Sequence, residues 1–378
     1  MKVLHLFSNA RWTGPAEPAL NLCVALREAG VEADFACPAN APGSAHTLLE
    51  TARDRGIQPF LGLRLNKHAK PIANWLDAAA LRSYLKTHPH DLIHCHLDND
   101  HRIAVAANKR AGLPIVRSSY EGGGFQNKEK LHRKLLAATH HFIEPAQAAL
   151  DYDAKRYGYP RDKMTVIPGA IDVERFDPTR QTPDARRWLG IPHDAFVIGI
   201  VARMQPHRRY EVLLDAIRRL TEQVGNVHLI VVGRGTRQET VAKQPARELG
   251  LEDRVHFPGY VAGENYVGML NAFDVKVFLV PGSDGTCRAV REAMAMGKPI
   301  VAANRGMLAE IVDNEQNGFV IDDTPEALAQ ALHQLATNRA HTRAMGHAAR
   351  KKARTLFSLQ AQAQATIAVY QSLLDFAK

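Results

Sequence analysis

Val280 to Ala302, V-P-G-S-D-G-T-C-R-A-V-R-E-A-M-A-M-G-K-P-I-V-A, is the stretch that decides the fold. The run before it, Asp274 to Val280, is apolar and β-branched, which is typical of a buried parallel strand. A Pro-Gly-Ser-Asp-Gly turn follows, and apolar residues at helical spacing then continue to a Gly-Lys-Pro stop. Another apolar run begins at Ile300, so the stretch predicts a strand, a polar loop, a helix and a second strand.

The polar loop of this unit is suited to binding a phosphate or the hydroxyls of a sugar. Backbone N–H groups and the positive end of the predicted helix meet there. Asp284 lies in the loop and Glu292 follows about two helical turns later, so both carboxylates can face one ligand of nucleotide-sugar length. The alternative is a structural helix with two solvated carboxylates.

This stretch resembles the donor-site motif of the glycosyltransferases of family 4, also called group 1. The motif reads acidic residue, Gly, a short run and Glu-Ala-Met-Ala-x-Gly-x-Pro; its first residue is usually Glu, so Asp284 has a shorter reach. The resemblance continues to Asn317-Gly318. It implies that Asp284 holds sugar hydroxyls and that Glu292 accepts hydrogen bonds from ribose. It also implies further donor contacts at Ser283, Gly285, Thr286, Cys287 and Arg288.

A second donor segment is the loop R-M-Q-P-H-R-R-Y at 203–210, where the family has Gly-Arg-Leu, a short loop and Lys-Gly. Arg203 matches the family's Arg, Arg208 falls where its Lys is expected, and Arg209 is next to it. An arginine can bind a phosphate with two hydrogen bonds. The resemblance therefore implies that Arg203 and Arg208 neutralise the diphosphate leaving group. A basic surface loop is the alternative interpretation.

Other positions complete the predicted donor site. Gly14 stands where the family places Gly-Gly-Ala-Glu beside the diphosphate, although an ordinary Gly-Pro turn explains the same residues. Gly233 opens a Gly-x-Gly that follows a predicted strand. Gly259 and Tyr260 resemble the family's Gly-Tyr turn near the nucleobase.

The predicted acceptor side lies in the N-terminal half. The segment Asp91 to His96 resembles the family's Asp-Ile/Val-x-His-x-His, whose second His, here His96, lies near the acceptor. Many family members end the next strand with Thr-x-His, and here Ser118-x-Tyr120 stands in that place. We therefore expect Tyr120 or Glu121 to hold the acceptor or the sugar.

Two patterns in the same segment suggest a metal. His94 and His96 could be a ligand pair, and Asp98-Asn99-Asp100 matches the Asp-x-Asp of metal-dependent transferases. The two histidines have no evident third ligand, and Asp-x-Asp is common and belongs to another transferase architecture. We predict no metal site and no cofactor besides the nucleotide-sugar substrate.

Composition restricts the class of protein. The 378 residues are 46% apolar and 23% charged, which predicts two globular domains. The net charge of +9 suits an anionic ligand or surface, and no basic cluster interleaved with aromatic residues indicates nucleic-acid binding. Four scattered cysteines, and the lack of a signal-peptide pattern or an apolar run of membrane length, predict a cytoplasmic location.

The segment from Lys128 to Ala138 predicts a basic amphipathic helix that could contact an anionic membrane, with a solvated helix face as the favoured alternative.

The resemblance as a whole implies an α/β fold with two Rossmann-like, doubly wound domains facing across a cleft, the GT-B architecture. We expect an acceptor-side domain at 1–170, a nucleotide-sugar-binding domain at 171–357 and a terminal helix at 358–378 that crosses back. The implied function is retaining, metal-independent sugar transfer to a glycan or lipid-linked hydroxyl acceptor, in cell-surface glycan or lipopolysaccharide biosynthesis at the inner face of the membrane. Two alternatives remain: a nucleotide-sugar epimerase or phosphorylase on the same fold, and a non-catalytic nucleotide-sugar-binding protein.

Overall fold

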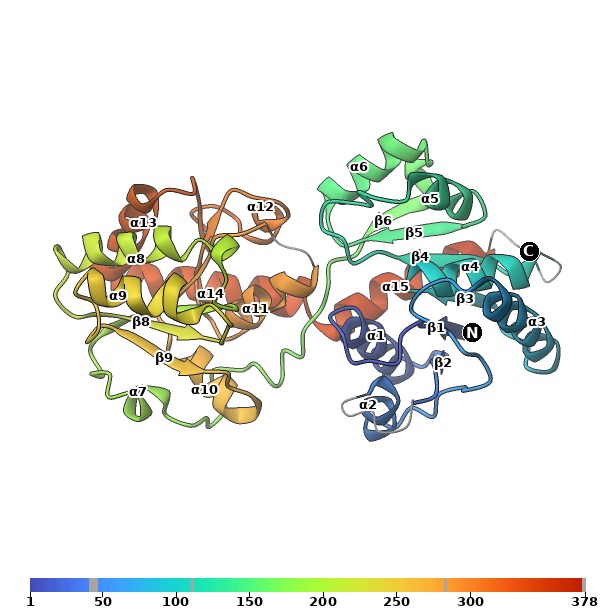
Figure 1. The fold of residues 1–378 in the computed structure, drawn as a ribbon, viewed down its shortest axis with the longest axis horizontal. Coiled ribbons are helices and arrows are strands. Elements are labelled where there is room, and N and C mark those ends of the chain that lie inside the picture. Colours follow the sequence, from blue (N-terminus) through green and yellow to red (C-terminus); the bar gives the residue numbers. More distant parts are fainter. Residues whose placement is uncertain (41–46, 110–111, 282–283, 376–378) are drawn as a thin grey trace. The chain divides into compact units, whose positions relative to one another are not determined.

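The computed structural model describes residues 1–40, 47–109, 112–281 and 284–375, apart from the side chains of 284–286. The chain divides into two compact units, each with its own six-stranded parallel sheet and covering helices (Figure 1). The first unit holds Met1–Ala170 and the C-terminal helix, and the second holds most of the chain between Ile171 and Ser358. The prediction of two doubly wound α/β domains is confirmed.

The sheet of the first unit has the strand order β2-β1-β3-β4-β5-β6. Most of its strand residues are buried, as expected for a parallel sheet with helices on both faces. The strands are β1 (Lys2–Leu6), β2 (Glu32–Ala36), β3 (Leu92–Cys95), β4 (Ile115–Ser118), β5 (His141–Glu144) and β6 (Met164–Val166).

The helices of this unit begin at clear sequence signals. A capping box starts α2, because the Thr47 side chain accepts from the Glu50 amide and the Glu50 side chain accepts from the Thr47 amide. Helix α3 begins at Pro71, since proline suits the first helical turn. The helices are α1 (Ala16–Glu28), α2 (Leu48–Asp54), α3 (Pro71–Thr87), α4 (Asp98–Asn108), α5 (Glu129–Leu136), α6 (Gln147–Tyr157) and α15 (Leu359–Asp375).

The terminal helix α15 belongs to the core of the first unit. It packs against α1, and Tyr370 is completely buried in a cluster that includes Phe7 and Leu20. The face of this helix that carries Ala363, Val369 and Tyr370 is therefore buried in the first unit.

The second unit repeats the design with the strand order β12-β11-β10-β7-β8-β9. Its strands are β7 (Phe196–Val201), β8 (Val227–Val232), β9 (Val255–Gly259), β10 (Val275–Phe278), β11 (Ile300–Ala303) and β12 (Gly318–Ile321). Its helices are α7 (Ala185–Trp188), α8 (Tyr210–Thr221), α9 (Gln244–Glu248), α10 (Gly263–Ala272), α11 (Asp284–Ala295), α12 (Leu308–Ile311), α13 (Pro325–Thr337) and α14 (Arg339–Leu356). No described helix combines the length and the apolar composition that crossing a bilayer requires.

Each sheet has one point at which the strand order reverses. In the first unit β1 lies between β2 and β3, and in the second β7 lies between β8 and β10. Doubly wound proteins bind ligands at the carboxyl ends of the strands that flank such a point. The loop after β7 carries Arg203 and Arg208, the loop after β10 leads into α11, and the loop after β3 begins with His96.

Candidate functional site

Two arginines, Arg203 and Arg208, mark the loop after β7. Arg203 is exposed and Arg208 is half-buried. Burial, together with the nearby positive charge of Arg203, lowers the pKa of Arg208. No carboxylate in the described part of the chain pairs with either guanidinium, and Nε of Arg208 is buried without a hydrogen-bond partner. Two like charges held together in this way are suited to an anion that bridges them.

Arg209 differs from its two neighbours. It pairs with Asp323 at 3.1 Å through Nε and with Glu211 at 3.2 Å, and Asp323 also pairs with Arg305 at 2.7 Å. Its backbone has a φ of 62°, in the left-handed region. These contacts already balance its charge, so Arg209 anchors the loop, and its predicted donor contact stays a prediction.

The two glycines of Gly233-Arg234-Gly235 let the loop after β8 pack against the arginine loop. A Cβ on Gly233 would lie 2.2 Å from the Ala202 carbonyl oxygen, and one on Gly235 would lie 2.2 Å from that of Met204. Both approaches are too close for any side chain. Gly233 therefore holds the backbone that carries Arg203, a structural reason for glycine that the sequence did not indicate.

An exposed aromatic ring follows β9. Tyr260 is 69% exposed, and the guanidinium carbon of Arg234 lies 5.4 Å from the centre of its ring. Gly259 has a φ of 80°, which favours glycine, and its carbonyl accepts from the Gly233 amide at 2.8 Å. The loops after β8 and β9 thus present a flat ring and a cation together, as expected for contact with a planar group such as a base.

Glu292 is buried on α11 and held by polar neighbours. Tyr266 donates to its Oε2 at 2.6 Å, and Nε of Arg288 lies 3.3 Å from its Oε1. Burial lowers the pKa of Lys276 to about 7, and the charge of Glu292 opposes that shift. With 4% exposure, Glu292 is not the solvated carboxylate of the alternative interpretation. A carboxylate has about four acceptor positions, so these contacts leave capacity for a ligand hydroxyl.

The polar loop before α11 is described only in part. Ser283 lies outside the described residues, and only the backbone of Asp284, Gly285 and Thr286 is described. The backbone places Asp284 at the start of α11, directly after β10 and its connecting loop. Cys287 is buried, and the Arg288 side chain is partly exposed.

The first unit carries a set of three buried imidazoles. His94 lies on β3, and His96 directly follows the end of that strand. The register of the sheet places His5 of β1 directly opposite His94. Their ring centres are 4.5 to 5.3 Å apart. The third histidine corrects the sequence argument, which found no further ligand for the His94–His96 pair.

Hydrogen bonds connect these rings to hydroxyl groups in two lines. One runs from His5 Nδ1 to His96 Nε2 at 3.0 Å and from His96 Nδ1 to the Tyr120 hydroxyl at 2.7 Å. The other joins Tyr370 to His94 Nδ1 at 2.5 Å and His94 Nε2 to Ser118 at 2.8 Å. Tyr120 is therefore held by His96 rather than left to rotate.

The rings are neutral at pH 7. Burial lowers the pKa of His5 to about 3 and puts those of His94 and His96 well below the usual 6.5. Possible ligand atoms of the three lie within 4.8 Å of one another, which is compatible with a metal. Both ring nitrogens of His94 are already hydrogen bonded, however, so ligation would displace a hydroxyl. The absence of a metal stays a prediction.

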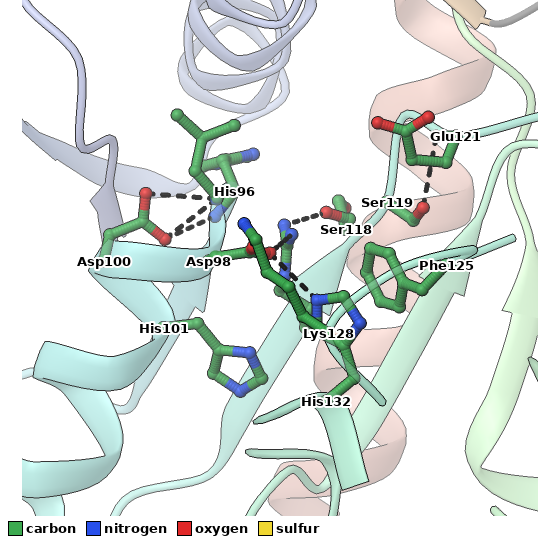
Figure 2. A network of polar contacts seen from close by, with 12 residues as sticks. His96, Asp98, Asp100, His101, Ser118, Ser119, Glu121, Phe125, Lys128 and His132 are labelled. Atoms are coloured by element: carbon green, nitrogen blue, oxygen red, sulfur yellow. Dashed lines mark hydrogen bonds and ion pairs between the residues drawn. The ribbon is translucent and has the colours of Figure 1, made fainter. Parts of the chain in front are cut away.

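The Asp-x-Asp pattern has structural partners. Asp100 accepts from the His96 amide at 3.0 Å (Figure 2). It also accepts from the Ser8 amide at 2.9 Å, which joins the loops after β1 and β3. Asp98 lies 2.7 Å from Lys128 Nζ and 3.2 Å from His132 Nε2. Although burial opposes it, the hydrogen bond from His132 helps hold the pKa of Asp98 well below its usual value.

A small pocket lies beside Tyr120. Ser118, Ser119 and Tyr120 supply its polar wall after β4, and Gln362 and Thr366 of α15 supply more hydroxyl and amide groups. Leu22, Ile143 and Ile167 form apolar parts of the wall. Hydroxyls beside apolar side chains match the two kinds of surface on a sugar ring.

The remaining predicted residues lie at the surface. Glu121 is exposed, and its amide donates to Ser119 Oγ at 3.2 Å (Figure 2). Gly14 is exposed just before α1, and nothing lies within 4 Å of a Cβ added there, so the protein interior does not require glycine at this position. That is compatible with close approach of a ligand to its backbone.

Two family models match successive parts of the chain. The model described as Glycosyltransferase Family 4 matches residues 13–175, and that described as Glycosyl transferases group 1 matches residues 181–352. The chain is 31% identical over 288 residues to a D-inositol 3-phosphate glycosyltransferase of Stackebrandtia nassauensis, covering 69% of this chain and 64% of the relative. A Streptomyces avermitilis protein of the same name is 27% identical over 309 residues, covering 76% of this chain and 66% of the relative. The matches thus span somewhat less than two thirds of these relatives.

Solved structures share the fold over almost the whole chain. A glycosyltransferase from Rickettsia africae superposes with a TM-score of 0.83 at 17% identity, covering 99% of this chain and 98% of that one. Anabaena HepE in complex with UDP superposes with a TM-score of 0.78 at 21% identity, covering 98% and 100%.

Proposed function

The chain belongs to the group 1 glycosyltransferases, and on that basis we propose that it transfers a sugar from a nucleotide-sugar donor to a hydroxyl acceptor. The observation that carries this proposal is the pair of arginines, Arg203 and Arg208, at the carboxyl end of β7. They lack anionic partners among the described residues and stand at the point where the strand order of the second unit reverses. A diphosphate would supply the missing negative charge.

The chemistry follows from where charge develops during transfer. The bond between the sugar and the diphosphate breaks, and negative charge grows on the leaving oxygen. Guanidinium groups beside the leaving oxygen would stabilise that charge, an electrostatic form of catalysis. The N-terminus of α11 follows the adjacent strand β10, so the N–H groups of its first turn would contribute in the same sense.

The other proposed donor contacts also come from residues of the second unit. Glu292, whose Oε2 accepts from Tyr266, would use its remaining acceptor positions for hydrogen bonds from the ribose hydroxyls. Tyr260 and Arg234 would contact the base. Asp284 would hold the sugar. HepE was solved with UDP and with UDP-glucose, so uridine diphosphate sugars are the first donors to test.

The acceptor would bind to the first unit. The Tyr120 hydroxyl, fixed by His96 beside a pocket of mixed polarity, is suited to orient an acceptor hydroxyl. The curated relatives are named for a phosphorylated inositol, so a phosphorylated polyol is a suitable first acceptor alongside glycans and lipid-linked sugars. We propose that the product keeps the donor's configuration, that no metal is needed, and that the glycan belongs to the cell surface.

A donor-consumption assay with and without acceptors tests this function. Release of UDP that depends on the acceptor, with a glycosylated product in the mass spectrum, is expected. Release of UDP or rearranged sugar without an acceptor would indicate an epimerase, hydrolase or phosphorylase instead. Tight nucleotide-sugar binding with no turnover under any condition would indicate a binding protein.

A further inference from the structure

We propose that the first two turns of α3 and the loop before them dock the protein on an anionic lipid bilayer. The helix exposes large apolar side chains at positions that share one face. Ile72 is 78% exposed, Trp75 is 70% exposed and Leu76 is 37% exposed. Spacings of three and four residues put these side chains side by side on the helix surface.

The charged residues in the segment around this apolar face are all basic. The segment from Leu61 to Leu76 contains Arg64, Lys67 and Lys70 and has no Asp or Glu. Lys67 and Lys70 are exposed, and no carboxylate of the described residues pairs with their ammonium groups. An apolar wedge edged by free lysines is the pattern of a surface that inserts into the interface of an anionic membrane.

The loop is built to hold this surface in place. The buried carboxylate of Asp77 accepts from the amides of Arg64 at 3.0 Å and Leu65 at 2.9 Å. Asn99 of α4 donates to the Asn66 carbonyl at 2.7 Å. The lysines therefore project from a fixed backbone next to the helix N-terminus, whose partial positive charge also favours lipid phosphates.

A bilayer fits this surface better than a protein partner does. A stable protein interface uses about 20–30 residues on each side, whereas the apolar part here is three side chains on two helical turns. Tryptophan is favoured at the boundary between lipid headgroups and acyl chains, where its ring is buried and its N–H stays near water. Past Leu76 the same stripe continues as Ala79, Ser83 and Lys86, so only the tip of the helix would enter the membrane.

The basic helix α5, which the sequence offered for this role, is less suited to it. Lys128 pairs with Asp98 at 2.7 Å, and Arg133 pairs with Glu129 at 3.1 Å, so two of its charges are already balanced. Its apolar residues Leu135 and Leu136 are buried in the protein. That leaves Lys130 and Lys134 as a solvated face.

Sedimentation of the full chain with lipid vesicles tests the proposal independently of glycosyl transfer. Vesicles of phosphatidylcholine alone and vesicles with added phosphatidylglycerol are compared. We expect binding only to the anionic vesicles. The double variant Ile72→Ser/Trp75→Ser should bind them at least about tenfold less tightly, because burying each such side chain contributes about that factor or more. Lys67→Gln/Lys70→Gln should also weaken binding, and added salt should weaken it further.

Lys130→Gln/Lys134→Gln on α5 is the matched control, with the same loss of charge and no expected loss of binding. Thermal unfolding confirms that each variant is folded. The proposal is wrong if the wild type does not bind anionic vesicles, or if only the α5 control loses binding. It is also wrong if light scattering shows a dimer that Ile72→Ser/Trp75→Ser dissociates, since the face would then contact a second copy.

Discussion

Replacing Glu292 with Gln tests whether its carboxylate binds a ligand or is purely structural, because the change keeps the shape of the side chain and removes its charge. Glu292 would bind ribose, which is present in the free nucleotide and in the nucleotide sugar alike. A hydrogen bond to a charged group is worth about 1.5–3 kcal/mol and a neutral one about 0.5–1.5 kcal/mol. We therefore expect Glu292→Gln to cost about 1–2 kcal/mol of nucleotide affinity, a weakening of about fivefold to thirtyfold.

The same change should affect folding in a defined direction. Lys276 is fully buried, burial lowers its pKa to about 7, and the charge of Glu292 opposes the shift. Without that charge the pKa of Lys276 should fall further, so its ammonium form is lost at neutral pH. Tyr266 can still donate to the amide oxygen, through a neutral hydrogen bond. A modest decrease in Tm is therefore expected together with the loss of nucleotide affinity.

Calorimetric titration with UDP and steady-state kinetics with the full donor measure these effects. Tyr266→Phe is the control, since it removes the 2.6 Å hydrogen bond to Glu292 but no proposed ribose contact; it should lower Tm and change UDP affinity little. Asp284→Asn should leave UDP affinity intact and lower kcat/KM, because its partner is the sugar. If Glu292→Gln lowers Tm but binds UDP like the wild type, the carboxylate is structural and the reasoning fails.

Three further predictions concern the first unit. Activity should survive EDTA, because both ring nitrogens of His94 are hydrogen bonded to hydroxyls; full loss of activity that Mn²⁺ or Zn²⁺ restores would contradict this. The contribution of the neutral His5 ring to the free energy of unfolding should be complete above pH 6.5 and fall as the pH drops toward 3, because burial lowers the pKa of His5 to about 3 and the unfolded chain binds the proton first. The free energy of unfolding should change by up to about 1.4 kcal/mol per pH unit for each such imidazole. Thermal melts of His5→Asn should show a weaker dependence on pH. Tyr120→Phe should lower kcat with UDP affinity unchanged, and equal activity would remove Tyr120 from the acceptor site.

The parts of the fold and site that rest on local patterns could be predicted from the sequence. Apolar runs and turn residues predicted the strand, loop, helix and strand around Val280 to Ala302, and the family resemblance implied the two doubly wound domains. The arginine loop and the helix of Glu292 follow strands β7 and β10, which the structure places side by side. In such a fold the loops after adjacent parallel strands leave the same edge of the sheet, so both loops can contribute to one site.

What the sequence did not show depends on register and tertiary packing. His5 and His94 are far apart in the chain and meet only because β1 and β3 pair in one particular register. Tyr370 reaches His94 because α15 returns to the first unit. A histidine in the first strand, together with the His-x-His, was the available signal. The burial of Glu292, and the ion pairs that distinguish Arg209 from Arg208, likewise depend on residues distant in sequence.

The measurement that tests the central claim most directly is UDP titration of the wild type and of Arg203→Ala and Arg208→Ala. Each variant should bind UDP at least about tenfold more weakly, because each loses a charged contact to the diphosphate worth about 1.5–3 kcal/mol. Arg247→Ala is the matched control, since Arg247 is an exposed arginine paired with Glu239, and it should bind UDP like the wild type. Unchanged UDP affinity in both Arg203→Ala and Arg208→Ala would contradict the diphosphate site proposed for the end of β7.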